Sequence, residues 1–344
     1  MFPQRGESLV KKPRSTLVAR RCITMNTILI VVPKTQIGTA TALGAVVIDN
    51  VASLTKPHLD VLSVILSTAG LAAFLYGISI VMSDVMPGLL CIVAGVMILT
   101  IFIMRQNQLK EPLLNFKPFS NIYFTLGVAM GFIAMLINFS LNAVMPSFLQ
   151  GSFGMASMTS AFFLLPGVLS NAVSTNISGK ILDKHGVKVM LPAGFIIFSA
   201  ALLVLSRCNE TSSLILILVM HILIYQGLAF SMSPAQTSAL ETLSSEMNSH
   251  GVAIVYTFNQ MAASVGSSLL GGIQSVRQAN AIANGATEAS AIAYGFSGTI
   301  MAAFVMGVIG IVLAVLVSHV PQTRLSIDAL GCMSGKENYA SEKR

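Results

Sequence analysis

Charged residues are scarce in this sequence, and tryptophan is absent. Only 10% of the 344 residues are charged, whereas 54% are hydrophobic. Soluble domains carry about 25% charged residues. So little charge cannot cover a water-facing surface of this size, so the composition argues against a soluble catalytic domain. It predicts an integral membrane protein instead.

Several motifs that would indicate chemistry are also missing. No cysteine lies in a CxxC pair, which argues against a zinc site or a disulfide framework. No HExxH metal motif and no GxxxxGK[ST] phosphate loop occurs. We therefore expect a protein that is not an enzyme and that has no catalytic residue, metal or cofactor. The formal net charge is +7. No basic stripe alternates with aromatic residues, so nucleic acid is not an expected partner.

Long apolar runs take the place of the missing charge. Each run is near the roughly 20 residues needed to cross hydrocarbon, and lipid offers no partner for exposed backbone groups. Each is therefore predicted to be a transmembrane helix, which makes the fold class all-α and polytopic. The eight predicted spans are 60–82, 86–104, 120–149, 155–178, 189–206, 212–235, 250–275 and 295–319.

Polar segments divide these spans into groups. Residues 105–119 mix basic and apolar residues with two prolines, and we interpret them as a cytoplasmic linker. Pro33 and Lys34 interrupt the first apolar stretch, which makes a helix there doubtful. The predicted parts are a basic segment 1–59 with the doubtful helix 24–49, a helix pair 60–104, the linker 105–119, a six-helix bundle 120–320 and a tail 321–344.

Basic residues lie almost entirely in alternate connections. One side holds eleven Lys and Arg residues, whereas the other holds only Arg207 and Arg277. By the positive-inside rule the rich side is cytoplasmic. We therefore expect a multi-pass protein of the cell (cytoplasmic) membrane, surrounded by the lipid bilayer, with its C-terminus in the cytoplasm.

Titratable groups are almost absent from the spans. No Asp, Glu, Lys or Arg lies well inside any of them, and His221 is the only titratable side chain deep in one. Since voltage sensors need a ladder of membrane arginines, voltage sensing is excluded. We interpret His221 as a packed, hydrogen-bonded residue rather than a proton carrier.

Neutral polar residues do cluster inside the spans. Asn138 and Asn142 are four residues apart, so they share one face of their helix. Such residues either line a water-filled path for a substrate or form hydrogen bonds between helices, worth about 0.6 kcal/mol each. The candidates for lining a path are Asn138, Asn142, Pro166, Tyr225, Gln226, Asn259 and Gln260.

The connection after the fourth span has a distinctive pattern. It reads GKILDKHGVK and fits G-x-x-x-D-[RK]-x-G-x-[RK]. Glycines permit tight turns, an acid can favour a helix N-terminus, and lysines fix the side of the membrane. The matching residues are Gly179, Asp183, Lys184, Gly186 and Lys188. This pattern resembles the cytoplasmic loop signature of the major facilitator superfamily.

Further stretches resemble the fourteen-helix drug/proton antiporters of that superfamily. The stretches are LDVLSVILSTAGLAAFLYGIS (59–79), KEPLLNFKPFSN (110–121), FLLPG (163–167), SPAQTSALETL (233–243) and HGVAIVYTFNQMAASVG (250–266). The resemblance implies that the last six helices form the C-terminal bundle and that 60–104 holds two central helices. It also implies proton-coupled efflux of drugs or other small amphipathic compounds by alternating access.

The sequence departs from this branch in specific places. Asn259-Gln260 stands where the branch often carries Arg-Gln, and Tyr256 stands where Asn is common. The N-terminal six-helix bundle, with its proton-coupling carboxylate, has no counterpart here. We therefore expect a truncated transporter that is inactive alone and uses protons only if an N-terminal half, such as a second chain, completes it. Two alternatives stay open: a non-transporting or regulatory membrane subunit, and half of a split transporter.

Overall fold

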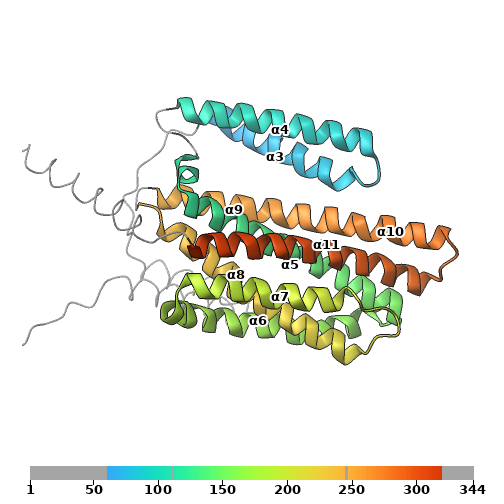
Figure 1. Cartoon of the computed structure of the whole chain (residues 1–344). Helices are drawn as coiled ribbons and strands as arrows, with labels where there is room; N and C mark the ends of the chain where they lie inside the picture. The colour runs from blue at the N-terminus through green and yellow to red at the C-terminus, as the bar shows by residue number, and fades with distance from the viewer. Residues whose placement is uncertain (1–59, 110–111, 113, 245–246, 320–344) are drawn as a thin grey trace, which may run out of the picture. The chain divides into compact units, whose positions relative to one another are not determined.

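The computed structural model describes residues 60–109, 112, 114–244 and 247–319. Every regular element within these ranges is a helix, which confirms the predicted all-α class (Figure 1). Seven of the described helices are long and apolar enough to cross a membrane. The doubtful helix 24–49 and the tail 321–344 lie outside the described residues.

Most of the helices extend beyond the apolar runs that predicted them. A helix can continue past the hydrocarbon because its own backbone bonds do not depend on the apolar side chains. The seven helices that could span a membrane are α3 (Val61–Ile80), α4 (Val85–Gln108), α5 (Ile122–Phe153), α6 (Ser157–His185), α7 (Val187–Leu205), α8 (Leu214–Glu241) and α11 (Glu288–His319). The remaining elements are η2 (Lys117–Ser120), α9 (Asn248–Val265), η3 (Gly266–Leu270) and α10 (Gly271–Ala283).

The predicted span 250–275 differs most from the structure. It lies within α9, η3 and α10, which follow one another without a break. η3 is a π-helix, a form that usually occurs as a single wide turn inside an α-helix. Its first residue, Gly266, packs on α5, where an added Cβ would lie 2.9 Å from the carbonyl carbon of Leu136. Apolar periodicity does not distinguish a π-turn from an α-turn, so the sequence pattern did not indicate this element.

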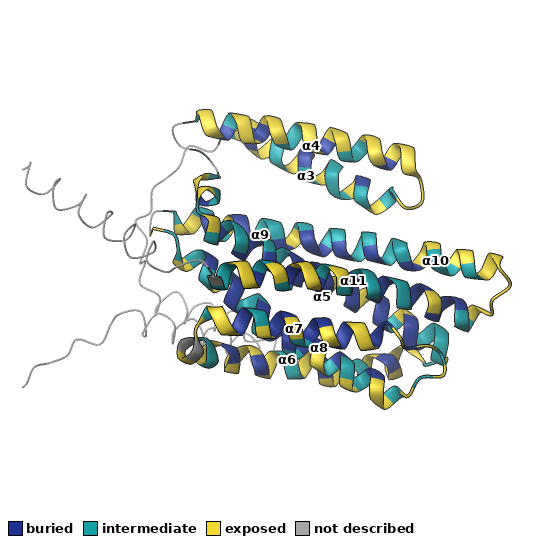
Figure 2. Cartoon of the chain, in the orientation of Figure 1, coloured by how far each residue is buried: buried dark blue, intermediate teal, exposed yellow. Residues whose placement is uncertain are grey.

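Glycines hold α3 and α4 together as an antiparallel hairpin (Figure 1). A Cβ on Gly77 would lie 2.6 Å from the backbone nitrogen of Ile92, and one on Gly95 would lie 2.5 Å from the backbone nitrogen of Phe74. Small residues of this kind let two helix backbones approach closely in a membrane. The large apolar side chains of both helices are mostly exposed (Figure 2), so the hairpin presents a hydrocarbon-like surface.

The main hydrophobic core draws its buried side chains chiefly from α5, α7, α8 and α11. Phe148 of α5 and Phe296 of α11 are fully buried and stack with ring centroids 3.9 Å apart. The backbones of α7 and α8 meet at two glycines, because a Cβ on Gly227 would lie 2.7 Å from the carbonyl oxygen of Gly194. Figure 2 shows the buried residues concentrated on these helices. The core fixes the positions of α5 and α8, which carry the polar residues described below.

The reversal between α6 and α7 occurs at a single residue. Gly186 has a φ of 75°, in the region that favours glycine, and α7 begins immediately after it. The prediction of a tight turn is therefore correct for Gly186 but wrong for Gly179. That residue lies inside α6, which continues to His185, well past the predicted end at 178.

Candidate functional site

α5 carries a stripe of residues that the rest of the described chain leaves partly uncovered. Phe139 is 40% exposed, Asn142 is exposed, and Asn138 is half-buried one turn earlier. The Asn142 side-chain nitrogen donates to the backbone carbonyl of Asn138 at 2.8 Å and to Asn138 Oδ1 at 3.4 Å. Two amides and an aromatic ring thus lie on neighbouring positions of one helix.

Tyr225 connects this stripe to α8 and α6. Its side chain is buried, and its hydroxyl donates to Asn142 Oδ1 at 3.2 Å. Asn171 of α6 donates to the backbone carbonyl of Tyr225 at 2.8 Å. A hydrogen-bonded chain therefore runs from α6 through α8 to α5 and ends at the exposed Asn142. All its members are neutral, so a molecule could bind there without the cost of desolvating a buried charge.

Gln226, the next residue of α8, forms a second set of bonds to α6. Its Oε1 accepts from the Ser174 hydroxyl at 2.5 Å, and its Nε2 donates to Ser170 Oγ. Both ends of this amide are therefore used between helices, which is one of the two roles considered for such residues. Sequence reasoning missed Ser170 and Ser174, although their four-residue spacing places them on one face of α6.

The other predicted path residues are not joined to these bonds in the described part of the chain. Pro166 is exposed on α6 and Gln260 is exposed on α9. Asn259, next to Gln260, is only 5% exposed. The seven predicted residues thus separate into a linked group, Asn138, Asn142 and Tyr225, an interhelical residue, Gln226, and three residues outside both sets.

His221 lies one turn from Tyr225 on α8 and is 2% exposed. Its ring meets the Tyr225 ring edge-on with centroids 4.8 Å apart. It packs against Gly167 of α6, where an added Cβ would lie 2.8 Å from His221 Nε2. The backbone of Leu164 interacts with the ring, but neither ring nitrogen meets hydrogen-bond geometry. The expectation of a packed histidine is therefore correct.

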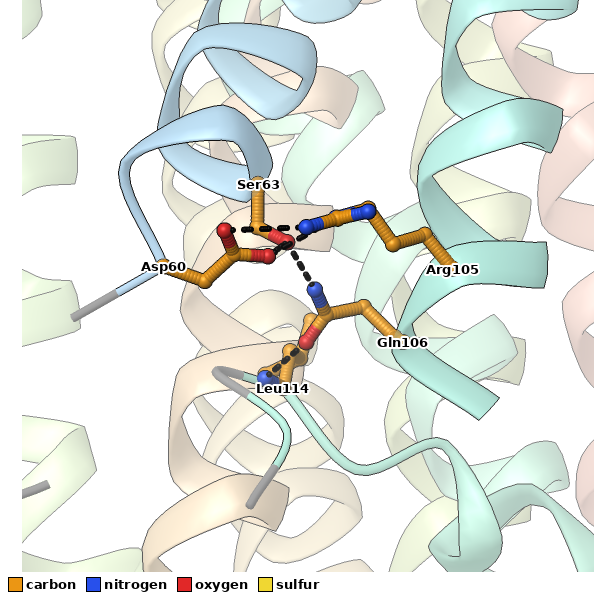
Figure 3. A network of polar contacts seen from close by, with 5 residues as sticks. All are labelled: Asp60, Ser63, Arg105, Gln106 and Leu114. Carbon is orange, nitrogen blue, oxygen red and sulfur yellow. Dashed lines mark hydrogen bonds and ion pairs between the residues drawn. The ribbon is translucent and has the colours of Figure 1, made fainter. Parts of the chain in front are cut away.

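A separate charged cluster fastens the ends of the α3–α4 hairpin (Figure 3). Arg105 Nε donates to Asp60 Oδ2 at 2.8 Å, and the Ser63 hydroxyl donates to the same oxygen at 2.6 Å. These two bonds lower the pKa of Asp60 from 3.8 to about 2, and the bond from Arg105 has the larger effect. Gln106 donates to Ser63 Oγ at 2.6 Å and accepts from the backbone N–H of Leu114 at 3.1 Å. The cluster thus joins both helices to the segment that follows α4.

The motif residues lie around the end of α6. All three lysines of this segment, Lys180, Lys184 and Lys188, are exposed. The motif led us to expect Asp183 beside a helix N-terminus. Its backbone instead lies in the C-terminal turn of α6, an end where the helix dipole disfavours an acid, and α7 begins four residues later.

The linked group on α5, α6 and α8 consists of neutral amides, a hydroxyl and an aromatic ring. No group of three or more His, Cys, Asp or Glu side chains in this part of the chain could hold a metal ion. Residues 60–267 match the Major Facilitator Superfamily. The chain belongs to this superfamily. Its members are membrane transporters and not enzymes, so this major facilitator chain is not an enzyme.

Two lincomycin resistance proteins are among the relatives of this major facilitator chain. LmrB of Bacillus subtilis (strain 168) is 31% identical over 293 residues, which cover 82% of this chain and 61% of that protein. LmrB of Listeria monocytogenes is 31% identical over 233 residues, 67% of this chain and 50% of the relative. An uncharacterized MFS-type transporter of B. subtilis, YcnB, is 30% identical over 276 residues, which cover 79% of this chain and 58% of YcnB. The chain spans about half the length of the curated relatives it matches.

Proposed function

We propose that the α5–α11 bundle forms one wall of the substrate path in a proton-coupled multidrug efflux transporter. The exposed end of the hydrogen-bonded chain carries this proposal. Asn142 lies uncovered on α5 near Phe139, and the buried Tyr225 hydroxyl orients its amide. A ring offers apolar contact and an amide offers directed hydrogen bonds, which together suit a small amphipathic drug.

The relatives support the same substrate class. Two of them are named for resistance to lincomycin, a drug. Transporters of this superfamily work by alternating access, with two bundles that rock around a site between them. In this proposal a second six-helix bundle, an N-terminal half or a separate chain, supplies the opposite wall. The α3–α4 hairpin would be the central pair of a fourteen-helix arrangement.

Protons are the coupling ion in this proposal. In the described residues, Asp and Glu occur only in connections or near helix ends, as at Glu241 and Glu288. The carboxylate that takes up the proton therefore belongs to the completing bundle. The exposed lysines around the α6–α7 turn support a cytoplasmic location for that end of the bundle, and the proposal assigns the C-terminus to the same side of the cell membrane.

The proposal can be tested by drug accumulation in a bacterial strain that lacks its own efflux pumps. The chain is expressed alone and together with the N-terminal half of B. subtilis LmrB, and uptake of labelled lincomycin is followed with and without a proton uncoupler. We expect reduced accumulation only when both halves are present, and full accumulation again with the uncoupler. If both halves insert and accumulation never changes, a non-transporting or regulatory subunit is the better description.

A pair of variants locates the path. Asn142→Leu should restore most of the accumulation, because it removes the exposed amide. Asn176→Leu is the matched control, since Asn176 is also exposed but bonds only to the Ala172 carbonyl of its own helix. Unchanged efflux by Asn142→Leu would show that the path does not pass this face of α5.

A further inference from the structure

The joined ends of α10 and α11 enclose an open pocket of about 630 Å³. The pocket is lined from α10 by Arg277 and Asn280 and, just after that helix, by Asn284. From α11 it is lined by Ser290 and Tyr294. Arg277 is the only charged residue among those that line the pocket. Glu288, the first residue of α11, is not one of them. The pocket therefore offers a cation without an opposing acid.

The Arg277 guanidinium has no polar partner in the described part of the chain. It lies over the Tyr294 ring, with Cζ 4.4 Å from the ring centroid. Its Nε is buried and makes no hydrogen bond. An arginine close to the hydrocarbon is costly unless an anion or another polar group satisfies its five N–H donors. The N–H donors of Arg277 are therefore available to bind a ligand.

α11 makes room for the guanidinium at Gly298. A Cβ there would lie 2.6 Å from Arg277 Cζ, so any larger residue would displace the side chain. Asn280 adds an exposed side-chain amide to the rim, and its backbone carbonyl accepts from Asn284 Nδ2 at 2.8 Å. The pocket therefore combines a positioned cation with neutral hydrogen-bonding groups.

We propose that this pocket binds a phosphate group through the Arg277 guanidinium and the Asn280 amide. The planar guanidinium presents parallel N–H donors that match two phosphate oxygens, and such charge-assisted bonds are the strong ones. Val276 and Ile282 on the same helix are 44% and 48% exposed, so apolar surface flanks the polar pocket. A phospholipid head group with its acyl chains would use both surfaces, whereas a soluble phosphate would use only the polar one.

Thermal unfolding of the purified full chain in mild detergent tests this site. The probes are phosphatidylglycerol, diacylglycerol, which lacks the phosphate, and soluble glycerol phosphate. We expect phosphatidylglycerol to raise the unfolding temperature and diacylglycerol not to do so. Arg277→Gln should weaken the apparent affinity for phosphatidylglycerol about tenfold or more, since it removes charge-assisted hydrogen bonds. Arg207→Gln, which changes an exposed arginine in the α7–α8 connection, should bind the lipid like the unchanged chain.

The outcomes separate the two sources of phosphate. An Arg277-dependent shift with glycerol phosphate of equal size would assign the pocket to soluble anions and keep the site. Equal shifts with phosphatidylglycerol and diacylglycerol, or an Arg277→Gln variant that binds as well as the unchanged chain, would overturn the proposal. If Arg277→Gln does not fold, Asn280→Leu on the exposed rim provides the same comparison.

Discussion

The α3–α4 hairpin and the α5–α11 bundle hold apolar helices together by different means. In the apolar windows of α3 and α4 only 22% and 17% of the residues are buried, compared with 50% in α5. The hairpin relies on close backbone approach at glycines and on one charged cluster at its end. The bundle adds stacked aromatic rings and a set of interhelical hydrogen bonds. Where few residues are buried, each close contact matters more.

The two regions also place their polar groups differently. The hairpin keeps its ion pair, Arg105 and Asp60, at the helix ends, where water or head groups can reach it. The bundle uses neutral amides and hydroxyls to join its helices, and one of these linked groups, Asn142, is exposed. The difference suggests that polar groups serve to fasten the hairpin and to contact a molecule in the bundle. Four variants test this comparison.

Phe296→Ala should have the largest effect, because it removes a fully buried ring that stacks on Phe148. Truncation of a buried phenylalanine costs about 3–5 kcal/mol. The free energy of unfolding in mild detergent, measured by titration with a denaturing detergent, reports this loss. Phe162→Ala is the control, since Phe162 is 62% exposed and should change little. Equal losses for the two variants would show that the bundle does not depend on this stack.

Gly77→Leu should separate α3 from α4, since there is no room for a side chain next to Ile92. Overpacking of this kind costs about 1–3 kcal/mol. The same titration measures it, with Ala69→Leu on the exposed side of α3 as the control. A stable Gly77→Leu hairpin would mean that backbone proximity is not what joins the two helices.

Much of the helical architecture could be predicted because lipid leaves the backbone few alternatives. The ends of the helices were harder to place. α4 continues past the predicted end at 104 because Arg105 and Gln106 find partners on α3 and beyond, which only the folded chain brings together. Gly266, where the π-turn begins, likewise packs on α5, and no local pattern indicates that contact.

The polar site was predictable only where its residues lie in one segment of the chain. The shared face of Asn138 and Asn142 follows from helical spacing within one segment. Their link to Tyr225 joins residues 83 positions apart, and a single sequence contains no signal for such a pairing. Serines are common in membrane helices, so Ser170 and Ser174 did not stand out as partners of Gln226.

Tyr225→Phe should have a smaller effect than either packing variant. It removes the hydroxyl that donates to Asn142 but keeps the ring. An interhelical hydrogen bond in a membrane contributes about 0.6 kcal/mol, so the free energy of unfolding should fall by about that amount. Tyr256→Phe changes a 66% exposed tyrosine and serves as the control. A loss as large as that of Phe296→Ala would mean that the bond supports the fold and not only the orientation of Asn142.

Asp60→Asn should have the smallest effect, because the pair is partly open to water, and ion pairs that water reaches contribute little and are screened by salt. The pKa of Asp60 is lowered from 3.8 to about 2 in the folded chain. The stabilisation is therefore fully present above pH 3.8 and is lost as the pH falls towards about 2. Unfolding titrations across this window should show the loss in the unchanged chain and in Asp84→Asn, but not in Asp60→Asn. A pH profile that Asp60→Asn leaves unaltered would assign the acid sensitivity to another group.

The π-helix η3 sets the rotational phase between α9 and α10. A π-turn contains about one residue more than an α-turn, and each residue of an α-helix advances the chain by about 100°. If the same residues Gly266–Leu270 formed an α-helical turn instead, α10 would be rotated by about that angle relative to α9. Arg277 would then swing away from Tyr294 while the face of α9 stayed in place. One extra residue in η3 thus determines which faces of α9 and α10 contact the neighbouring helices.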